Sequence, residues 1–524
     1  MILDATIPST EGVGKALSSL LTGAGHEPII VSLVKRYTKL GQTAVLVLGL
    51  WIVSTSAGFL LAQNVDIWTM SQEERAAYFA KLRTLSSIDY RKMLQMLDLE
   101  LPSGLPDPAE DPRRPAGLTQ REGSTNWYDA DGNTYVRSSW GTWTNYDESK
   151  AGSYTLPDPL ILKNGRRVRD AETWWQQRRP EILEDFEREV YGRTPKNTPQ
   201  VTFEVTETED GALGGKAIKR TVVGHVDNSR YPGANPTIEI TLYLAAGVQG
   251  PTPLMVVNGG FFGPFPGRRP DPGPSPMDQV LGLGWAYATV NTSGIQMDSG
   301  AGLDKGIIGL VNEGRPRKPD DWGALAAWCW GLSRALDYFE TVPEIDAKKI
   351  GIEGHSRWGK TALLAGALDQ RWAIVYSSCS GAMGTSLEKR NWGETIDNVA
   401  GVGEYHWMAP NFLKYAGHWD EMPVDAHELI ALVAPRPIFV TGGTHDQWSD
   451  PHGEFLACVG ADPIYRLLGR KGLGTTEMPA PDVALMDGEL AFRNHEGGHT
   501  DRLDWPLFLT FALRYFGGPD PASP

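Results

Sequence analysis

The sequence is poor in cysteine and in positive charge. Its 524 residues include three cysteines, Cys329, Cys379 and Cys458, and no CxxC pair. So few cysteines exclude a disulfide framework, and their spacing gives no indication of structural zinc. Lys and Arg number 49 against 64 Asp and Glu, a formal net charge of −15, without any long basic run. The chain as a whole therefore lacks the electrostatic character of a nucleic-acid-binding protein.

Long hydrophobic runs are also scarce. The mean hydropathy of −0.30 excludes a protein with many membrane spans. The composition, 41% hydrophobic and 22% charged, excludes a disordered or fibrous chain. No internal repeat is present, and the length suits one large domain or two ordinary ones with a generous core.

One apolar run lies near the N-terminus. Residues 43–62 carry no charge and follow the basic stretch Lys35–Lys39. The run is long enough to span a bilayer, and its basic flank is typical of a signal peptide. A signal peptide normally begins near residue 1, so either the true start lies downstream of Met1 or the segment is an uncleaved anchor. A buried core helix is the third reading, and it is disfavoured because core helices seldom stay apolar on every side.

These features divide the N-terminal part of the chain. We expect an N-terminal extension at 1–35, a signal peptide or membrane anchor at 36–62, and a helical and linker region at 63–155. The protein is then secreted or periplasmic, or anchored through 43–62. Within the linker region, Asp129–Asn133 resembles part of a calcium loop. Position twelve of that loop is Trp140 and not Glu, so a turn is the better interpretation.

From residue 156 the pattern predicts an ordered α/β domain that extends to residue 524. Three alternating segments predict antiparallel strands, and short apolar strands then alternate with helices, which indicates a mainly parallel sheet covered on both faces. The predicted strands are 201–208, 217–226, 237–245, 253–257, 285–291, 350–353, 373–377 and 437–441, and the clearest helices are 173–191, 322–340, 360–368 and 505–516.

The segment 349–360 carries the main chemical signal. A strand runs to Gly354, a sharp turn carries Ser356, and a helix rich in Ala and Leu follows. This order is typical of the nucleophile elbow of α/β-hydrolases, which presents a serine hydroxyl above a three-layer sandwich. The next glycine is Gly359, one position later than in the G-x-S-x-G pattern. The alternative is that Ser356 only caps the helix.

A serine nucleophile needs a base and an acid, which follow it in the order acid and then His in this fold. His499 lies in a Gly-rich loop after the last strand and before the final helix, and is the expected base. The rival, His495, is interpreted as a loop residue. Asp446 comes just after strand 437–441 and is the expected acid, while Asp450 is interpreted as closing a turn before Pro451.

These motifs resemble the glucuronoyl esterases, carbohydrate esterase family 15, and their bacterial branch in particular. The similarity extends from about residue 156 to the C-terminus. Gly354–Lys360 resembles the family's G-x-S-R-x-G-K signature, which accounts for the late glycine. Further matching segments are 178–182, 189–192, 390–395 and 446–448.

The resemblance implies roles for seven residues and no metal or organic cofactor. Ser356 would attack the ester carbonyl, with His499 as base and then acid and Asp446 as the orienting carboxylate. Arg357 would supply its backbone N–H and its guanidinium to the oxyanion. The sugar would be bound by Lys360, Glu394 and Trp448.

The chain departs from the family at several positions. Cys379 occupies the place of the catalytic Glu of many members, so the acid must come from Asp446. His355 and Thr500 replace the cysteines of a disulfide found in fungal members, and His355 is interpreted as a packed neighbour. Residues 258–261, Asn-Gly-Gly-Phe, are expected to line the site.

The expected function is a serine-type carboxylic ester hydrolase acting through an acyl-enzyme. Its substrates would be esters of D-glucuronic acid, or of its 4-O-methyl ether, as in the links between plant glucuronoxylan and lignin alcohols. No nucleic-acid or protein partner is expected. Two alternatives stay open: an acetyl xylan or other carbohydrate esterase, and a non-catalytic surface carbohydrate-binding protein, which an intact Ser356, Asp446 and His499 set disfavours.

Overall fold

The structure is a computed structural model that describes residues 70–259 and 273–517. The apolar run 43–62, predicted to be a signal peptide or anchor, lies outside these residues. None of the described helices is both long and apolar enough to cross a bilayer.

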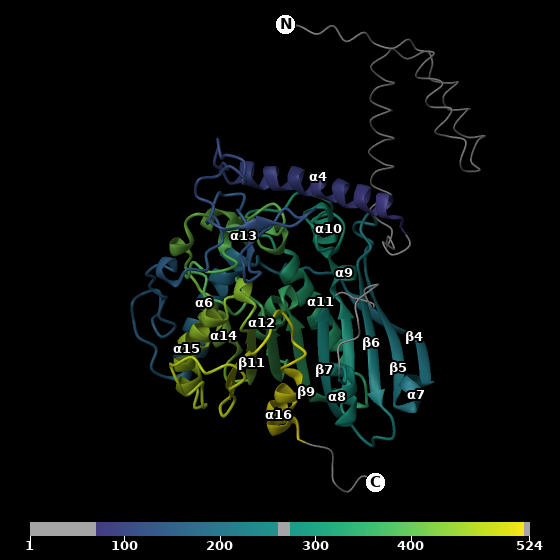
Figure 1. The fold of residues 1–524 in the computed structure, drawn as a ribbon. Helices are drawn as coiled ribbons and strands as arrows, with labels where there is room; N and C mark the ends of the chain where they lie inside the picture. Colours follow the sequence, from purple (N-terminus) through teal and green to yellow (C-terminus); the bar gives the residue numbers. More distant parts are fainter. Residues whose placement is uncertain (1–69, 260–272, 518–524) are drawn as a thin grey trace, which may run out of the picture. The chain divides into compact units, whose positions relative to one another are not determined.

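A ten-stranded sheet forms the centre of the protein (Figure 1). Its strand order is β12-β13-β11-β10-β9-β7-β8-β6-β5-β4. The six neighbouring strands β13, β11, β10, β9, β7 and β8 are parallel to one another. Strands β6, β5 and β4 follow β8 in antiparallel pairs, and β12 pairs antiparallel with β13 at the other edge. The strands are β4 Val201–Gly211, β5 Ala217–Val226, β6 Thr237–Ala245, β7 Thr252–Gly259, β8 Ala286–Asn291, β9 Ile345–His355, β10 Ile374–Ser378, β11 Ile438–Gly443, β12 Ala484–Leu485 and β13 Leu490–His495.

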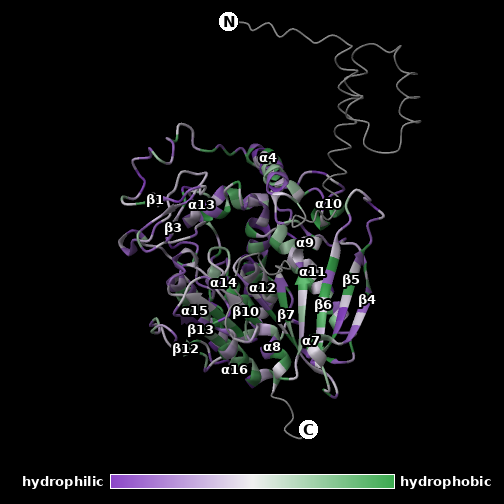
Figure 2. Ribbon diagram, turned by 45° about the vertical axis from the view of Figure 1, so that its right-hand side comes forward, coloured by the Kyte–Doolittle hydropathy of each residue, from purple (hydrophilic) through white to green (hydrophobic). Residues whose placement is uncertain are grey.

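The hydrophobicity of each strand follows its position in the sheet. All five residues of β10 are buried because helices cover both of its faces, whereas most of β4 is exposed at the edge. Figure 2 shows the same contrast, with green concentrated on the inner strands and purple on β4. The predicted strands are confirmed, including the antiparallel set.

Helices pack on both faces of the sheet, so that two separate cores lie between three layers. Val375 of β10 packs into the larger core, while its neighbour Tyr376 points into the smaller one. The larger core is covered by α11 Ala324–Phe339, α12 Arg357–Leu368, α14 Ala426–Val433 and α15 Pro451–Leu467, and the smaller one by α8 Pro276–Gly282 and α16 Trp505–Phe516. This arrangement confirms the predicted three-layer α/β sandwich.

The predicted helix 173–191 is helical but not uniform. It consists of α5 Ala171–Thr173 and α6 Arg179–Asp185, with wide π turns after each at Trp174–Arg178 and Phe186–Val190. Trp174 is fully buried in the larger core. The shorter helices elsewhere are α7 Ala212–Gly215, α9 Thr292–Ile295, α10 Ile307–Val311 and α13 Ile396–Val399.

Helix α4, Gln72–Met96, is the first helix of the described residues and packs against loops outside the sheet. Ser71 and Glu74 form a capping box at its start. The Tyr90 hydroxyl donates a hydrogen bond to the Ala400 carbonyl at 2.8 Å, and the Tyr405 hydroxyl donates to Asp89 Oδ2 at 2.8 Å. Helix α4 therefore holds the segment 400–405 in place.

A small antiparallel sheet follows α4. Its strands are β1 Thr119–Gln120, β2 Trp127–Tyr128 and β3 Thr134–Tyr135. Between β2 and β3 the Gly132 N–H donates to the Asp129 carbonyl at 3.2 Å, and Asp129 accepts further hydrogen bonds from Asp131 and Asn133. The turn interpretation of this segment is thus confirmed.

Candidate active site

Strand β9 ends at His355, and α12 begins at Arg357, so that Ser356 occupies the turn between them. Ser356 has φ 61° and ψ −130°, a conformation that is costly for a residue with a side chain and is found at functional turns. Its side chain makes no capping hydrogen bond to the helix. The helix-cap alternative is therefore wrong, and the turn has the form of a nucleophile elbow.

Two glycines allow this elbow to close. A Cβ at Gly354 would collide with the Trp358 carbonyl, and one at Gly359 would lie 2.9 Å from the Ser378 carbonyl oxygen. The late glycine of the motif is thus required where α12 crosses the end of β10. The Asn258 amide donates to the carbonyls of Glu353 (2.8 Å) and Trp358 (3.1 Å), so it supports the elbow from behind.

The predicted role of residues 258–261 is met only in part. Asn258 is 3% exposed, and its amide nitrogen donates both of its hydrogen bonds to the elbow backbone. It therefore acts as a support, and its amide is not free to face a substrate. Gly260 and Phe261 lie outside the described residues.

The predicted base and acid are hydrogen-bonded to each other. His499 Nδ1 lies 2.7 Å from Asp446 Oδ2. The Asp446 side chain is buried, whereas that of His499 is 41% exposed and so remains accessible from the solvent side. Burial acts to raise the pKa of Asp446, but the hydrogen bond and charge of His499 outweigh it, and the pKa lies below its ordinary value. A charged Asp446 can orient the imidazole and stabilise an imidazolium.

Cys379 lies beside this pair without replacing the acid. Its thiol donates to the Thr500 carbonyl at 3.8 Å, and burial raises the pKa of the thiol well above its ordinary value. Cys379, Asp446 and His499 are the one group of potential metal ligands found among the residues that the structure describes, with ligand atoms within 4.8 Å of one another. A cation there would compete with the Asp446–His499 hydrogen bond.

Asp450 has a structural position. Its backbone is left-handed (φ 50°), and its carboxylate accepts a hydrogen bond from the Gly453 N–H (3.0 Å) at the start of α15. The same carboxylate pairs with Arg390 Nε at 2.9 Å. Asp450 therefore closes the turn and caps the helix, as the sequence indicates.

Two further histidines surround His499. The ring of His355 lies 4.3 Å from that of His499, and burial lowers the pKa of His355 to about 3, so it is a neutral packing neighbour. The interpretation of His495 as a loop residue is wrong. It is the last residue of β13 and is fully buried, with Nδ1 2.8 Å from Asp504 and Nε2 2.9 Å from the Gly498 carbonyl.

Arg357 is held by a residue that the sequence did not reveal. Its Nη1 donates to Asp298 Oδ2 at 2.6 Å, while Asp298 Oδ1 accepts from His406 and Trp407. Burial opposes ionisation of Asp298, but His406, Arg357 and Trp407 together lower its pKa below the ordinary value. The charged Asp298 thus fixes the guanidinium close to the start of α12. Asp298 lies in a loop 108 residues before His406 in the sequence, so no local pattern indicated that the two residues meet.

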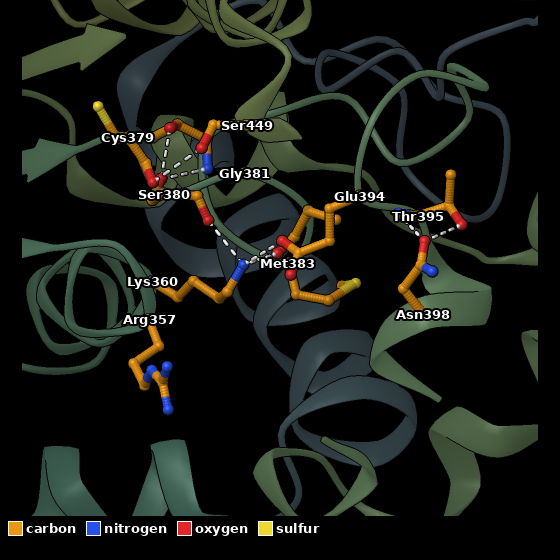
Figure 3. Close-up of polar contacts among 12 residues, drawn as sticks. Arg357, Lys360, Cys379, Ser380, Gly381, Met383, Glu394, Thr395, Asn398 and Ser449 are labelled. Atoms are coloured by element: carbon orange, nitrogen blue, oxygen red, sulfur yellow. Dashed lines mark hydrogen bonds and ion pairs between the residues drawn. The ribbon is translucent and has the colours of Figure 1, made fainter. Parts of the chain in front are cut away.

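Lys360 and Glu394 form a buried ion pair at 2.6 Å. Figure 3 shows the Lys360 ammonium pointing toward Glu394. The ammonium donates also to the carbonyls of Ser380 (2.7 Å) and Ala382 (2.6 Å). Both side chains are at most 6% exposed, so Lys360 is not a solvated surface residue. The Glu394 N–H donates to the Trp448 carbonyl at 2.8 Å, which brings the third predicted sugar-binding residue next to the pair.

Glu404 is a second residue that the sequence analysis missed. Burial and the charge of Glu394 raise the pKa of Glu404 to about 8, against the opposing charges of Lys360 and Arg357. Its Oε2 is buried and has no hydrogen-bond partner among the described residues. A neutral carboxyl at this place can both donate and accept a hydrogen bond.

Part of the N-terminal region is built into the site. The Asn145 carbonyl accepts a hydrogen bond from the Gly393 N–H at 3.0 Å. Glu148 pairs with Arg390 through both carboxylate oxygens, at 2.8 and 2.6 Å. These contacts hold the segment 390–394, which carries Glu394.

Comparisons with known proteins identify relatives of this chain. A family model described as "Glucuronyl esterase, fungi" matches residues 317–469. The chain is 34% identical over 403 residues to a carbohydrate esterase from an unknown prokaryotic organism, covering 71% of this chain and 92% of that protein. It is 29% identical over 333 residues to a 4-O-methyl-glucuronoyl methylesterase of Cerrena unicolor, covering 62% and 63%.

Solved structures give the same result. A glucuronoyl esterase of carbohydrate esterase family 15 from Teredinibacter turnerae matches with a TM-score of 0.71 and 36% identity, covering 82% of this chain and 99% of that one. The chain therefore belongs to the glucuronoyl esterases of carbohydrate esterase family 15 and has their α/β-hydrolase fold.

Proposed function

We propose that the protein hydrolyses esters of D-glucuronic acid or its 4-O-methyl ether, including those that join plant glucuronoxylan to lignin alcohols. The observation that carries the proposal is the buried Lys360–Glu394 pair beside the elbow. Burying two charges is costly, and an ester hydrolase does not need such a pair for the chemical step itself. The name of the Cerrena unicolor relative, a 4-O-methyl-glucuronoyl methylesterase, supports a uronate as the acyl group.

In the proposed mechanism Ser356 Oγ attacks the ester carbonyl while His499 takes its proton. The charged Asp446 orients the imidazole and stabilises the imidazolium. The alcohol then leaves with the proton from His499. In the second half of the reaction His499 takes a proton from water, the water oxygen attacks the acyl-enzyme, and Ser356 leaves with that proton. The Arg357 N–H and guanidinium stabilise the oxyanion, and a single donor of this kind contributes a factor of about 10²–10³ in rate.

The sugar ring is bound by groups beyond the triad. Glu394 accepts hydrogen bonds from the ring hydroxyls, and Trp448 packs against the ring face. Lys360 acts through Glu394, because its three ammonium hydrogens are already donated to Glu394, Ser380 and Ala382. Glu404, neutral near pH 7, adds a group that can donate to a ring oxygen. No metal or organic cofactor takes part in these steps.

We further propose that residues 156–524 are the catalytic domain and that residues 63–155 are an accessory region. The segment 43–62 would direct the protein out of the cytoplasm as a signal peptide or anchor. The natural substrate would then be plant cell-wall polysaccharide, met outside the cell.

The decisive experiment measures hydrolysis of benzyl glucuronate by the wild type and by Ser356→Ala. The wild type should turn over, and the variant should lose at least 10⁴-fold in kcat with an unchanged circular dichroism spectrum. Full activity of the variant would exclude the serine mechanism. A folded wild type that is inactive on the glucuronate ester but active on acetylated xylan would favour the acetyl esterase alternative.

A further inference from the structure

The Cys379 thiol has no role in the proposed mechanism, although it lies beside residues that carry the mechanism out. Cys379 follows directly after β10, and its N–H donates to the Thr441 carbonyl of β11 at 2.7 Å. Its backbone is left-handed (φ 45°), a conformation that is costly for a residue with a side chain and persists only where the surrounding structure enforces it. The end of the sheet therefore holds this residue in one place.

Three side chains of different chemistry meet at this point. One potential ligand atom each from Cys379, Asp446 and His499 lies within 4.8 Å of the other two. A thiolate, a carboxylate and an imidazole are all ligands of Zn²⁺, which binds them in a tetrahedral arrangement whose ligand atoms are about 3.3–3.6 Å apart. The distances in the protein lie on both sides of this value, from 2.7 Å between His499 Nδ1 and Asp446 Oδ2 up to the limit of 4.8 Å. Small side-chain movements are therefore enough to bind the ion.

The charges of the three ligands balance those of a divalent cation. A thiolate and a carboxylate carry two negative charges together, and a neutral imidazole adds none. The complex with Zn²⁺ is therefore neutral, the form that burial penalises least, and Cys379 and Asp446 are both buried. The exposed His499 side chain gives the ion access from solvent and leaves a fourth position for water.

Hydrogen bonds hold the segments that carry the ligands together. The Ser449 hydroxyl donates to the Cys379 carbonyl at 3.2 Å (Figure 3), and the Ser449 N–H donates to the Asp446 carbonyl at 3.1 Å. The Gly497 N–H donates to Thr444 Oγ1 at 3.1 Å, which joins the loop before His499 to the loop before Asp446. The three ligands are thus preformed as a group, which lowers the ordering cost of binding.

We propose that Cys379, Asp446 and His499 form an inhibitory site for Zn²⁺. The ion forms bonds to Cys379 Sγ, to a carboxylate oxygen of Asp446 and to one ring nitrogen of His499, and the thiol proton passes to solvent, as it does from thiols that bind zinc. No electron is transferred. The inference needs only these three ligands and does not depend on which ester is the substrate.

The bound ion removes the general base. A neutral imidazole has one lone pair and one N–H, and whichever nitrogen of His499 binds zinc, the other nitrogen keeps the proton. No lone pair is then left to take the proton of Ser356. The zinc-bound protein is therefore inactive, and removal of the ion restores it.

The sulfur ligand decides which ions inhibit. Thiolate favours Zn²⁺ and Cd²⁺, whereas Mg²⁺ and Ca²⁺ prefer oxygen ligands. The first test measures hydrolysis of benzyl glucuronate at increasing free Zn²⁺, Cd²⁺ or Mg²⁺ in a buffer without thiols. Zn²⁺ and Cd²⁺ should inhibit the wild type and EDTA should restore it, while Mg²⁺ at the same concentrations should have no effect.

Variants assign the inhibition to Cys379. Cys379→Ala and Cys379→Ser should each raise the Zn²⁺ concentration for half inhibition about 100-fold, because loss of a mere supporting contact to a ligand already costs about 10–100-fold in affinity. Cys458→Ala, which removes another buried cysteine, is the matched control and should be inhibited like the wild type. An uninhibited wild type, equal inhibition of the wild type and the Cys379 variants, or inhibition by Mg²⁺ as strong as by Zn²⁺ would overturn the inference.

A spectroscopic measurement separates this inference from the proposed function. Co²⁺ replaces Zn²⁺ in such sites and gives a thiolate-to-metal charge-transfer band in the near ultraviolet when a cysteine binds it. Ser356→Ala with Co²⁺ should show this band, and Cys379→Ser should not. The band in a protein without glucuronate esterase activity would retain the metal site and refute the proposed function. Esterase activity without the band and without zinc inhibition would do the reverse.

Discussion

Two His–Asp pairs have histidines that are close in the sequence, His495 and His499, and only one pair is suited to catalysis. His499 and Asp446 are 2.7 Å apart, and His495 and Asp504 are 2.8 Å apart. The His499 side chain is 41% exposed, whereas both side chains of the second pair are fully buried. In the second pair the other ring nitrogen of the histidine is also engaged, by the Gly498 carbonyl at 2.9 Å.

The comparison shows that a His–Asp hydrogen bond by itself does not indicate a catalytic pair. A general base needs one ring nitrogen for the acid and the other for the nucleophile. His495 uses both nitrogens within the fold, and Asp504 also accepts from Arg493 at 2.5 Å. Within the described residues, the first pair therefore has the ring nitrogen free that the proposed chemistry needs, and the second holds the end of β13 against the start of α16.

The largest expected difference between the pairs is in activity. Asp446→Asn should lower kcat about 10⁴-fold, because the amide favours the wrong imidazole tautomer and does not stabilise the imidazolium. Activity on benzyl glucuronate and the melting temperature are measured together. Cys379→Ala is the matched control, a neighbouring buried side chain that should change kcat by less than threefold. If Cys379→Ala proved the more damaging, the acid would have been misplaced.

The comparison also explains what the sequence could and could not predict. The elbow and the helix Trp505–Phe516 depend on local patterns and were predicted almost to the residue, whereas the strand before the elbow was predicted as 350–353 and extends over Ile345–His355. His495 was misassigned because the glycines after it suggested a loop, while its burial depends on β11, with which β13 pairs.

The residues that the prediction missed are defined by contacts between distant segments. Asp298 matters because His406 and Trp407, more than 100 residues away, meet at its carboxylate. Glu404 matters because it is buried beside Lys360 and Glu394. Neither lies in a motif with a characteristic spacing. Such residues become visible only when the fold brings their partners together.

The next expected difference is in stability. His495→Gln should lower the free energy of unfolding by about 2–3 kcal/mol, because it removes a buried, charge-assisted hydrogen bond to Asp504. Arg493 still pairs with Asp504, which limits the loss. Chemical denaturation measures it, and activity per folded molecule should stay within about threefold. His495→Asn is the control: its amide retains a donor near the Nδ1 position, so an equal loss from both variants would contradict the role given to this bond.

The smallest effect expected is the pH dependence of that stability. Burial acts to lower the pKa of His495, but the hydrogen bond and charge of Asp504 outweigh it, so the pKa of the folded state lies above 6.5. The folded protein then binds this proton more tightly than the unfolded chain does. The stabilisation is complete below the unfolded pKa of about 6.5 and is lost as the pH rises through the folded pKa.

The difference in unfolding free energy between the wild type and His495→Gln should therefore be largest near pH 6 and should shrink toward pH 9. Taking the difference cancels the other groups, including His355, whose depressed pKa of about 3 makes it act in the opposite direction. Urea unfolding at several pH values gives the curve. A difference that grew with pH would mean that His495 is held neutral in the fold, and the buried pair would then be a neutral hydrogen bond, not an ionic one.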